Sequence, residues 1–146
     1  MHGENLFKTR ERHNSPYVLK EDSKAIFEGC KFKSLNTYTD NDSNLLKVYL
    51  SFSKGTEGFS FYLSQLPFNC GMIVIGHLRG FITQDIIKMI VALCKKMGYT
   101  IVLHTDNNTF LSPDLKAVGF KSNRALSVVN MRSRNKLTTH VYKITE

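Results

Sequence analysis

The feature that most constrains this 146-residue chain is a strand–helix–strand pattern over residues 72–103. Residues 72–75 are an uninterrupted apolar run, typical of a strand that is buried on both faces. A helix is predicted over residues 84–97, with Thr83 as its N-cap. Residues 100–103 are predicted to form a second buried strand. Because a single helix joins the two strands, we expect them to lie parallel in one sheet.

The predicted helix is amphipathic, with apolar residues at helical spacing and lysines on the opposite side. Its apolar positions are Ile86, Ile87, Ile90, Val91, Leu93, Cys94 and Met97. We interpret this face as part of the core, and Cys94 as a buried thiol rather than a nucleophile.

Shorter elements are predicted before this unit. Alternating apolar residues predict strands over 46–53 and 59–63, joined by a glycine-containing loop. Turn-forming residues predict a loop over 34–44.

The N-terminal part is predicted to begin with a loose polar arm over residues 1–16. A short strand at 17–19 and a short helix at 21–28, closed by Gly29, are expected to follow.

After the central unit, a second and shorter helix is expected, with Ser112 as N-cap, Pro113 in its first position and Gly119 at its end. Residues 125–131 and 137–144 are predicted to form a final hairpin.

The composition is that of one folded domain, since 42% of the residues are hydrophobic. No apolar run is long enough to span a bilayer, and no apolar segment follows Met1. The odd number of widely spaced cysteines, Cys30, Cys70 and Cys94, argues against a disulfide scaffold or a structural zinc site. We therefore expect a cytoplasmic protein that holds no metal.

The charge is basic, with 20 Lys and Arg against 12 Asp and Glu, a formal net charge of +8. Six of the cations but only one carboxylate lie in the last 26 residues. Such a field favours an anionic partner, either nucleic acid, a phosphate-bearing cofactor or an acidic protein surface. The alternative is a solvated face without a partner. The candidate partner-binding residues are Lys121, Arg124, Arg132, Arg134 and Lys136.

Two histidines, His77 and His104, each follow a predicted buried strand. At the carboxyl edge of a parallel pair they could meet, with Asp106 nearby, as a metal or acid–base site. The alternative is two ordinary histidines at strand ends, since no histidine recurs at a ligand spacing such as i, i+4.

Residues 79–120 carry a family resemblance. Arg79-Gly80 precedes the amphipathic helix, and Asn108 stands eleven residues before the Gly119-Phe120 that follows the short helix. In this order the stretch resembles the GNAT (Gcn5-related) N-acetyltransferases. The resemblance implies an α/β (α+β) fold, a GNAT-like mixed β-sheet with one long crossover helix and a short second helix, in a single domain over residues 17–146.

The resemblance also implies a site for acetyl-CoA. Family members hold the pyrophosphate on a glycine-rich loop at the start of the crossover helix. A bulge in the preceding strand exposes an amide that polarises the thioester carbonyl, and a tyrosine on the next helix protonates the departing thiolate. The positions implied here are Arg79, Gly80 and Thr83 for phosphate, Gly76, His77 and Leu78 for the thioester, and Asn108 for the pantetheine arm.

The chain departs from the family pattern at two of these places. Bulky Ile82 and acidic Asp85 stand where glycines are expected, and Leu115 occupies the position of the tyrosine. The first hypothesis is therefore a domain that has lost catalysis, needs no cofactor, and acts as a binding or structural protein through its basic C-terminal face. The alternative is an active acyl-CoA-dependent N-acetyltransferase with a divergent pyrophosphate loop. Similar degenerate domains occur among small proteins of tailed bacteriophages, which implies a phage origin and a location in the host cytoplasm or the virion.

Overall fold

A computed structural model describes residues 16–39, 46–65, 71–106, 111–123, 128–130 and 135–144. The elements in chain order are α2 (Pro16–Ile26), β1 (Lys31–Thr39), β2 (Leu46–Lys54), β3 (Glu57–Gln65), β4 (Met72–Gly80), α3 (Gln84–Lys96), β5 (Ile101–Asp106), α4 (Ser112–Val118), β6 (Lys121–Ser122), β7 (Val128–Asn130) and β8 (Asn135–Lys143). The strands form one mixed sheet in the order β1-β2-β3-β4-β5-β8-β6, with β7 also paired to β8.

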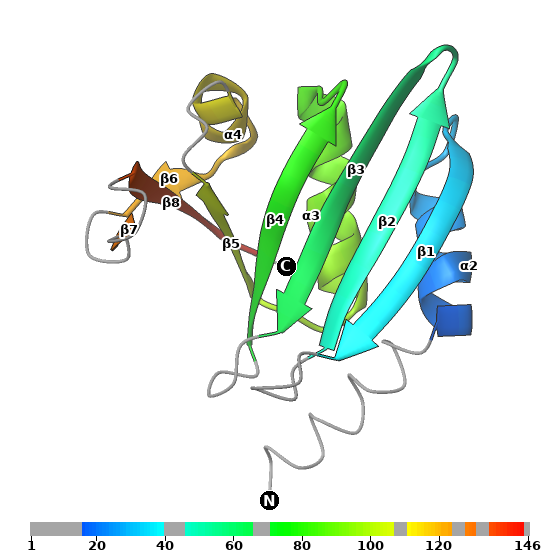
Figure 1. Ribbon diagram of the computed structural model, residues 1–146, viewed down its shortest axis with the longest axis horizontal. Helices are drawn as coiled ribbons and strands as arrows, with labels where there is room; N and C mark the ends of the chain where they lie inside the picture. Colours follow the sequence, from blue (N-terminus) through cyan, green and yellow to red (C-terminus); the bar gives the residue numbers. More distant parts are fainter. Residues whose placement is uncertain are drawn as a thin grey trace, which may run out of the picture.

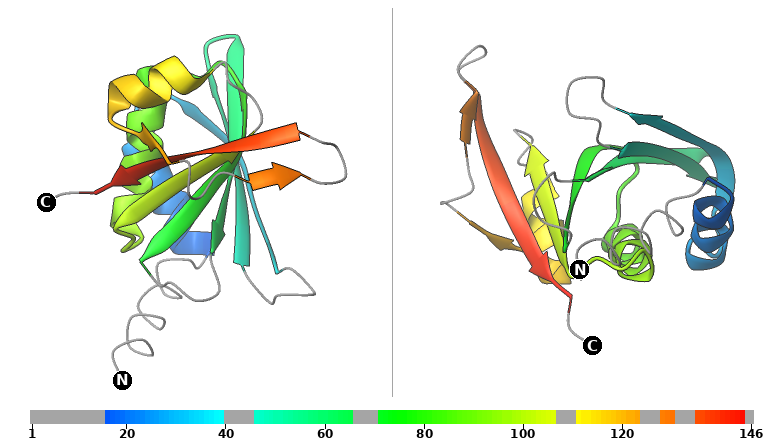
Figure 2. Two further views of the ribbon diagram at one scale, coloured as in Figure 1. Left: turned by 90° about the vertical axis from the view of Figure 1, so that its left-hand side faces the viewer. Right: turned by 90° about the horizontal axis from the view of Figure 1, so that it is seen from below.

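The described helices lie in one layer. Helix α3 contacts both α2 and α4, and α2 and α3 lie behind the strands in Figure 1. Seen from below in Figure 2, these two helices lie on the same side of the sheet. The opposite face, called the open face below, carries no described helix.

The central unit has the predicted connection. Strands β4 and β5 run parallel, with Met72–Ile75 in register with Ile101–His104, and α3 joins them. Helix α3 begins where predicted, because the Thr83 hydroxyl oxygen accepts a hydrogen bond from the Ile86 amide at 3.2 Å. The predictions of a parallel pair and of its crossover helix are confirmed.

The core lies between the helices and the sheet. Phe27 after α2 stacks on Phe52 with ring centroids 4.5 Å apart, and Phe59 and Phe61 lie within 5.9 Å of it. The predicted apolar face of α3 is buried against the same cluster. Burial raises the pKa of the Cys94 thiol to about 12, so this cysteine is an inert core residue, as predicted.

Two N-terminal predictions are wrong. Residues 17–19 belong to α2, because Pro16 begins that helix and Leu19, Ser23 and Phe27 form a buried stripe at four-residue spacing. Residues 34–39, predicted as loop, belong to β1. A register shift between Phe32 and Ser34 breaks the alternation there and so hides the strand pattern.

Strand β4 is longer and less buried than predicted. Ile73 and Ile75 face the core, whereas Met72 and Val74 are partly exposed on the open face. The apolar run is therefore covered by helices on one side only, and the strand continues to Gly80.

The C-terminal predictions are largely confirmed. Helix α4 ends at Gly119, and β7 pairs with β8 as the final hairpin. The N-cap prediction is wrong by one residue, since Leu111 occupies that position and makes no side-chain capping bond. Strand β6 was not predicted, because two residues are too few to show a pattern.

No helix among the described residues is long and apolar enough to cross a membrane. The predicted arm lies outside the described residues apart from Pro16, which belongs to α2.

Candidate functional site

The two parallel strands separate at a fork. Their pairing ends at Ile75 and His104, although β4 continues to Gly80 and β5 to Asp106. Figure 1 shows the upper parts of β4 and β5 diverging from this point. A forked parallel pair leaves the facing edges of both strands available to a ligand.

Strand β4 bulges just beyond the fork point. Tyr62 pairs with Gly76 and Ser60 with Arg79, so that Phe61 alone faces both His77 and Leu78. His77 has a φ of 51°, a left-handed conformation that costs a non-glycine residue about 1–2 kcal/mol.

The bulge changes which side chains face outward. Regular alternation after Ile73 and Ile75 would turn residue 77 into the core. Instead Leu78 fills the core at 2% exposure, while His77 and Arg79 are both exposed. The Arg79 guanidinium also donates a hydrogen bond to the Leu78 carbonyl at 3.1 Å.

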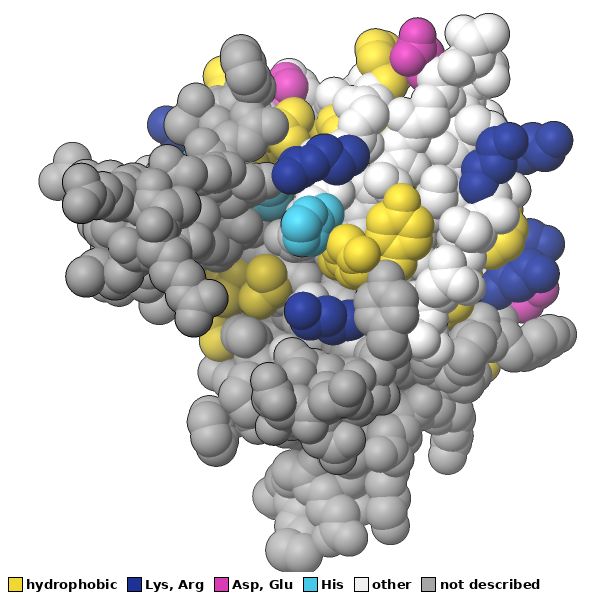
Figure 3. Space-filling view, viewed as in Figure 1, with side chains coloured by type: hydrophobic (Ala, Val, Ile, Leu, Met, Phe, Trp, Pro, Cys, Tyr) yellow, Lys and Arg dark blue, Asp and Glu magenta, His cyan; other side chains and the backbone are white. Residues whose placement is uncertain are grey.

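A hollow of about 390 Å³ lies beside the bulge on the open face. The residues that line it are Lys47, Tyr62, Ser64, Gly76 and His77. The rings of Tyr62 and His77 make an edge-to-face contact, with their centroids 4.9 Å apart. Tyr49 extends this aromatic wall, 4.9 Å from Tyr62. Figure 3 shows a histidine on this face with basic and hydrophobic side chains around it.

The loop that joins β4 to α3 is fastened to the β2–β3 hairpin. Gly80 has a φ of +92°, and a side chain there would collide with the carbonyl oxygen of Gly58. The Phe81 amide donates to that same carbonyl at 2.9 Å, while the Phe81 ring stays 52% exposed. The Gly80 position therefore requires glycine for a structural reason.

The start of α3 differs from a glycine-rich phosphate cradle. Ile82 packs against the core, and the Thr83 hydroxyl oxygen accepts the hydrogen bond of the Ile86 amide. Asp85 places a carboxylate in the first turn of the helix. A carboxylate at a helix N-terminus competes with phosphate for the positive end of the helix dipole. A bulge is thus present in the strand where the resemblance implies one, whereas the loop before α3 lacks the glycine-rich form that the resemblance implies for pyrophosphate.

Two further positions, Leu115 and Asn108, were named from the family resemblance. Leu115 is 1% exposed in α4 and packs in the core. Its hydrocarbon side chain has no proton to supply. Asn108 lies outside the described residues.

The two histidines of the predicted carboxyl-edge site do not meet. Both lie within strands, His77 on the open face and His104 buried on the helix side. His104 instead pairs with His140 of β8, with ring centroids 6.4 Å apart. Burial, and next the charge of Lys116, lower the pKa of His140. Among the residues that the structure describes, no three His, Cys, Asp or Glu side chains are grouped so that they could hold a metal ion.

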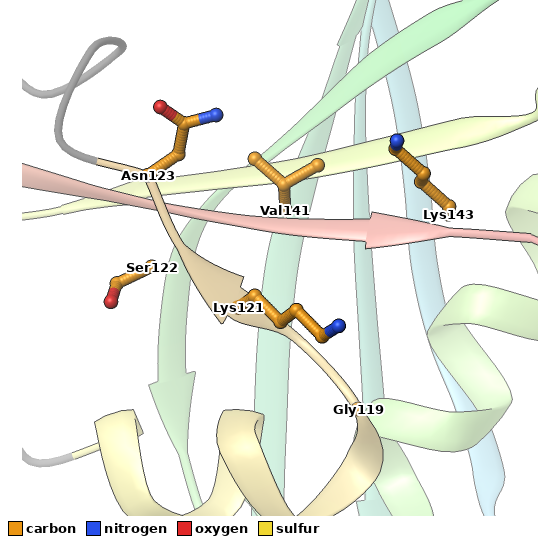
Figure 4. A pocket seen from close by; sticks show the side chains of 6 residues that line it. All are labelled: Gly119, Lys121, Ser122, Asn123, Val141 and Lys143. Carbon is orange, nitrogen blue, oxygen red and sulfur yellow. The ribbon is translucent and has the colours of Figure 1, made fainter.

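The basic C-terminal region contains a second hollow, of about 430 Å³. Lys121 of β6 and Lys143 of β8 line it, and Figure 4 shows Val141 beside Lys143 on β8. Of the other predicted partner-binding residues, Lys136 lies in β8 opposite Val129. Arg124, Arg132 and Arg134 lie outside the described residues.

Sequence reasoning named Gly76 and His77 but missed the other three residues that line the hollow beside the bulge. Lys47, Tyr62 and Ser64 are the non-core positions of strands whose alternation was recognised. That alternation was the available signal, but it does not show which outward residues lie next to a bulge in a third strand.

No protein-family model matches the sequence, and no curated protein is similar to it in sequence. The structure resembles a probable acetyltransferase from Staphylococcus epidermidis ATCC 12228, with 12% sequence identity and a TM-score of 0.52, over 97% of this chain and 93% of that one. It also resembles a probable acetyltransferase of the GNAT family from Chromobacterium violaceum ATCC 12472, with 17% identity and a TM-score of 0.49, over 67% of this chain and 58% of that one.

The structural likeness to the Staphylococcus protein extends over almost the whole of both chains. Because the sequence identity is only 12%, this likeness shows a shared fold and nothing further. This chain has the acetyltransferase fold. The GNAT-like mixed sheet predicted from residues 79–120 is therefore confirmed as a fold.

Proposed function

We propose that this protein binds acetyl-CoA, or a related acyl-CoA, in the fork between β4 and β5 and transfers the acyl group to an amine on the open face. The observation that carries the proposal is the bulge at His77 and Leu78, which stands at the mouth of the fork. A strained backbone persists only where the surrounding structure enforces it, and such residues cluster at functional sites. Bound there, acetyl-CoA would supply a thioester whose carbonyl carbon the amine attacks, with loss of the CoA thiol.

The residues around the bulge have distinct roles in this proposal. The bulge interrupts the regular pairing of β4 with β3 at residues 77 and 78, and in this proposal a backbone amide there donates to the developing oxyanion. His77 is exposed at the same bulge, and in this proposal its imidazole accepts the proton that the attacking amine releases. Since Leu115 has a hydrocarbon side chain with no acidic proton, the thiolate takes its proton from water or from another group.

Deletion of His77 tests the bulge. Removing this one residue restores regular pairing with β3 and still leaves Leu78 facing the core. We expect the deletion variant to fold, as measured by circular dichroism and urea unfolding, but to lose acyl transfer measured as release of free CoA thiol. The matched control is Lys88→Ala, an exposed substitution on α3 that should leave transfer unchanged.

Calorimetric titration of the full chain with acetyl-CoA measures the binding step directly. We expect a dissociation constant in the micromolar range, about −8 kcal/mol for 1 μM. Absence of binding at millimolar acetyl-CoA, or unchanged transfer in the folded deletion variant, would contradict the proposal.

A second candidate function is supported by buried Leu115 and by the basic hollow at Lys121 and Lys143. In this proposal the fold has lost catalysis and binds an acidic protein surface or nucleic acid through its C-terminal face. This proposal includes a phage origin and a location in the host cytoplasm or the virion.

Fluorescence anisotropy with a labelled DNA duplex and with a labelled acidic peptide tests this candidate. Double substitutions of Lys121 and Lys143, and of Arg132 and Arg134, by alanine should each weaken binding and reduce its salt dependence. Alanine at both Lys95 and Lys96, which are exposed at the end of α3, is the control of equal charge. Equal losses in all three variants would indicate a general charge effect and contradict a specific C-terminal site.

A further inference from the structure

We infer that the acceptor of this protein is a small amine that also carries a carboxylate or phosphate, and that it docks in the hollow between Lys47 and His77. The inference rests on the proposed acyl transfer and names the chemical class of its acceptor. It is carried by the charge of the open face, the size of the hollow and its position beside the bulge.

The open face is basic where it meets the bulge. By strand register, its residues in β2, β3 and β4 are Lys47, Tyr49, Ser51, Ser53, Ser60, Tyr62, Ser64, Met72, Val74, Gly76, His77 and Arg79. None of these described positions is acidic. In Figure 3 the acidic side chains in view lie at the rim of the face, whereas basic ones lie beside the histidine. A ligand that is purely cationic would be repelled here, and an anionic group would be attracted.

The hollow has the dimensions of a small-molecule site. Its volume of about 390 Å³ falls within the range of about 300–1,000 Å³ that small ligands occupy. Lys47 offers a cation, Ser64 a hydroxyl group, and Tyr62 an aromatic wall continued by Tyr49. These groups suit an acid joined to an apolar or aromatic body.

The same charges favour the reaction. Neighbouring cations disfavour the protonated form of an amine and so raise the fraction of the neutral, nucleophilic form. Because the hollow is lined by His77 of the bulge and by the adjacent Gly76, an amine held by its acid group at Lys47 lies close to the backbone of the bulge.

Rates of CoA release with paired acceptors test the inference on the full chain. The pairs are O-phosphoethanolamine against ethanolamine, and phenylalanine against phenylalaninamide. We expect kcat/KM to be about tenfold higher for the anionic member of each pair. Lys47→Met should bring the ratio close to one without changing the affinity for acetyl-CoA. Lys54→Met, in the same strand but away from the hollow, is the control and should keep the ratio.

A binding experiment without acetyl-CoA separates this inference from the proposed function. Titration with 3-phenylpropionate should shift the His77 imidazole proton resonance, and 3-phenylpropanamide should shift it much less. If no acceptor is acylated but the acid binds selectively, the acyl-transfer proposal fails while the anionic site stands. Preference for neutral or cationic amines, an unchanged ratio in Lys47→Met, or no shift with about 10 mM acid overturns the inference. Tighter competition at this resonance by a DNA oligonucleotide would overturn the small-molecule class.

Discussion

The two ends of the fork differ in how well they suit the acyl-CoA site that we propose. At the bulge, the backbone departs from regular pairing and holds His77 in a left-handed conformation. At the start of α3, the backbone is regular, Thr83 caps the helix, and Ile82 packs against the core. One end is strained, whereas the other is capped and well packed. Strain of the first kind is what a functional constraint leaves in a structure.

The difference also shows why a sequence motif is an incomplete guide to this fold. A phosphate cradle is encoded by glycines, so the difference from that pattern is visible in Ile82 and Asp85. A bulge is encoded by register between two strands, so it persists without a recognisable motif.

The largest expected effect comes from the loop that joins β4 to α3. Gly80→Ala should lower the free energy of unfolding by roughly 3 kcal/mol, because it combines a positive φ with a collision against Gly58. Urea unfolding measures this loss. Gly76→Ala is the control, since nothing lies within 4 Å of the added carbon and its φ is not positive. Equal losses in the two variants would show that the loop is not held by the hairpin.

A substitution at the bulge should separate strain from activity. His77→Gly should raise the free energy of unfolding by about 1 kcal/mol, because glycine adopts a φ of 51° without penalty. Acyl transfer should fall about 100-fold if the imidazole accepts the proton of the amine. The measurements are urea unfolding and CoA release. A stabilised variant with full activity would reduce the bulge to a backbone feature and remove His77 from the chemistry.

A substitution at the opposite end tests how phosphate is held there. Asp85→Asn should tighten acetyl-CoA binding about threefold, since it removes a like charge from the helix start, and should lower stability by about 0.5 kcal/mol. Calorimetry and urea unfolding measure the two effects. Glu57→Gln, an exposed carboxylate in the β2–β3 hairpin, should change neither. Unchanged affinity in Asp85→Asn would mean that the phosphates lie away from α3.

The smallest effect concerns the buried pair formed by His104 of β5 and His140 of β8. Burial and Lys116 lower the pKa of His140 below its ordinary value of 6.5, whereas the unfolded chain keeps that value. Protonation therefore favours the unfolded chain, and stability present above pH 6.5 is lost as the pH falls towards the folded-state pKa. Between about pH 7.5 and 5.5, the wild type should lose more stability than His140→Gln in urea unfolding. Equal losses would assign the pH dependence to other groups.

Local chemistry made part of the fold predictable. The apolar stripe of α3, its Thr83 cap and the alternating strands β2 and β3 follow from side-chain spacing alone. Strand β1 was missed because its bulge at residue 33 shifts the alternation. The helix predicted over 21–28 overlaps α2, but the first turn of α2 was predicted as a strand because the buried stripe of this helix includes a serine, Ser23.

For the candidate site, the sequence by itself determined the strand–helix–strand unit on which the site is built. It could do so because hydrophobic periodicity and capping are properties of neighbouring residues. The tertiary structure decided that His77 faces outward, that Leu78 replaces it in the core, and that Lys47 and Tyr62 stand beside them. Those placements depend on the register between β4 and β3, a relation between separate segments that only packing of the whole sheet fixes.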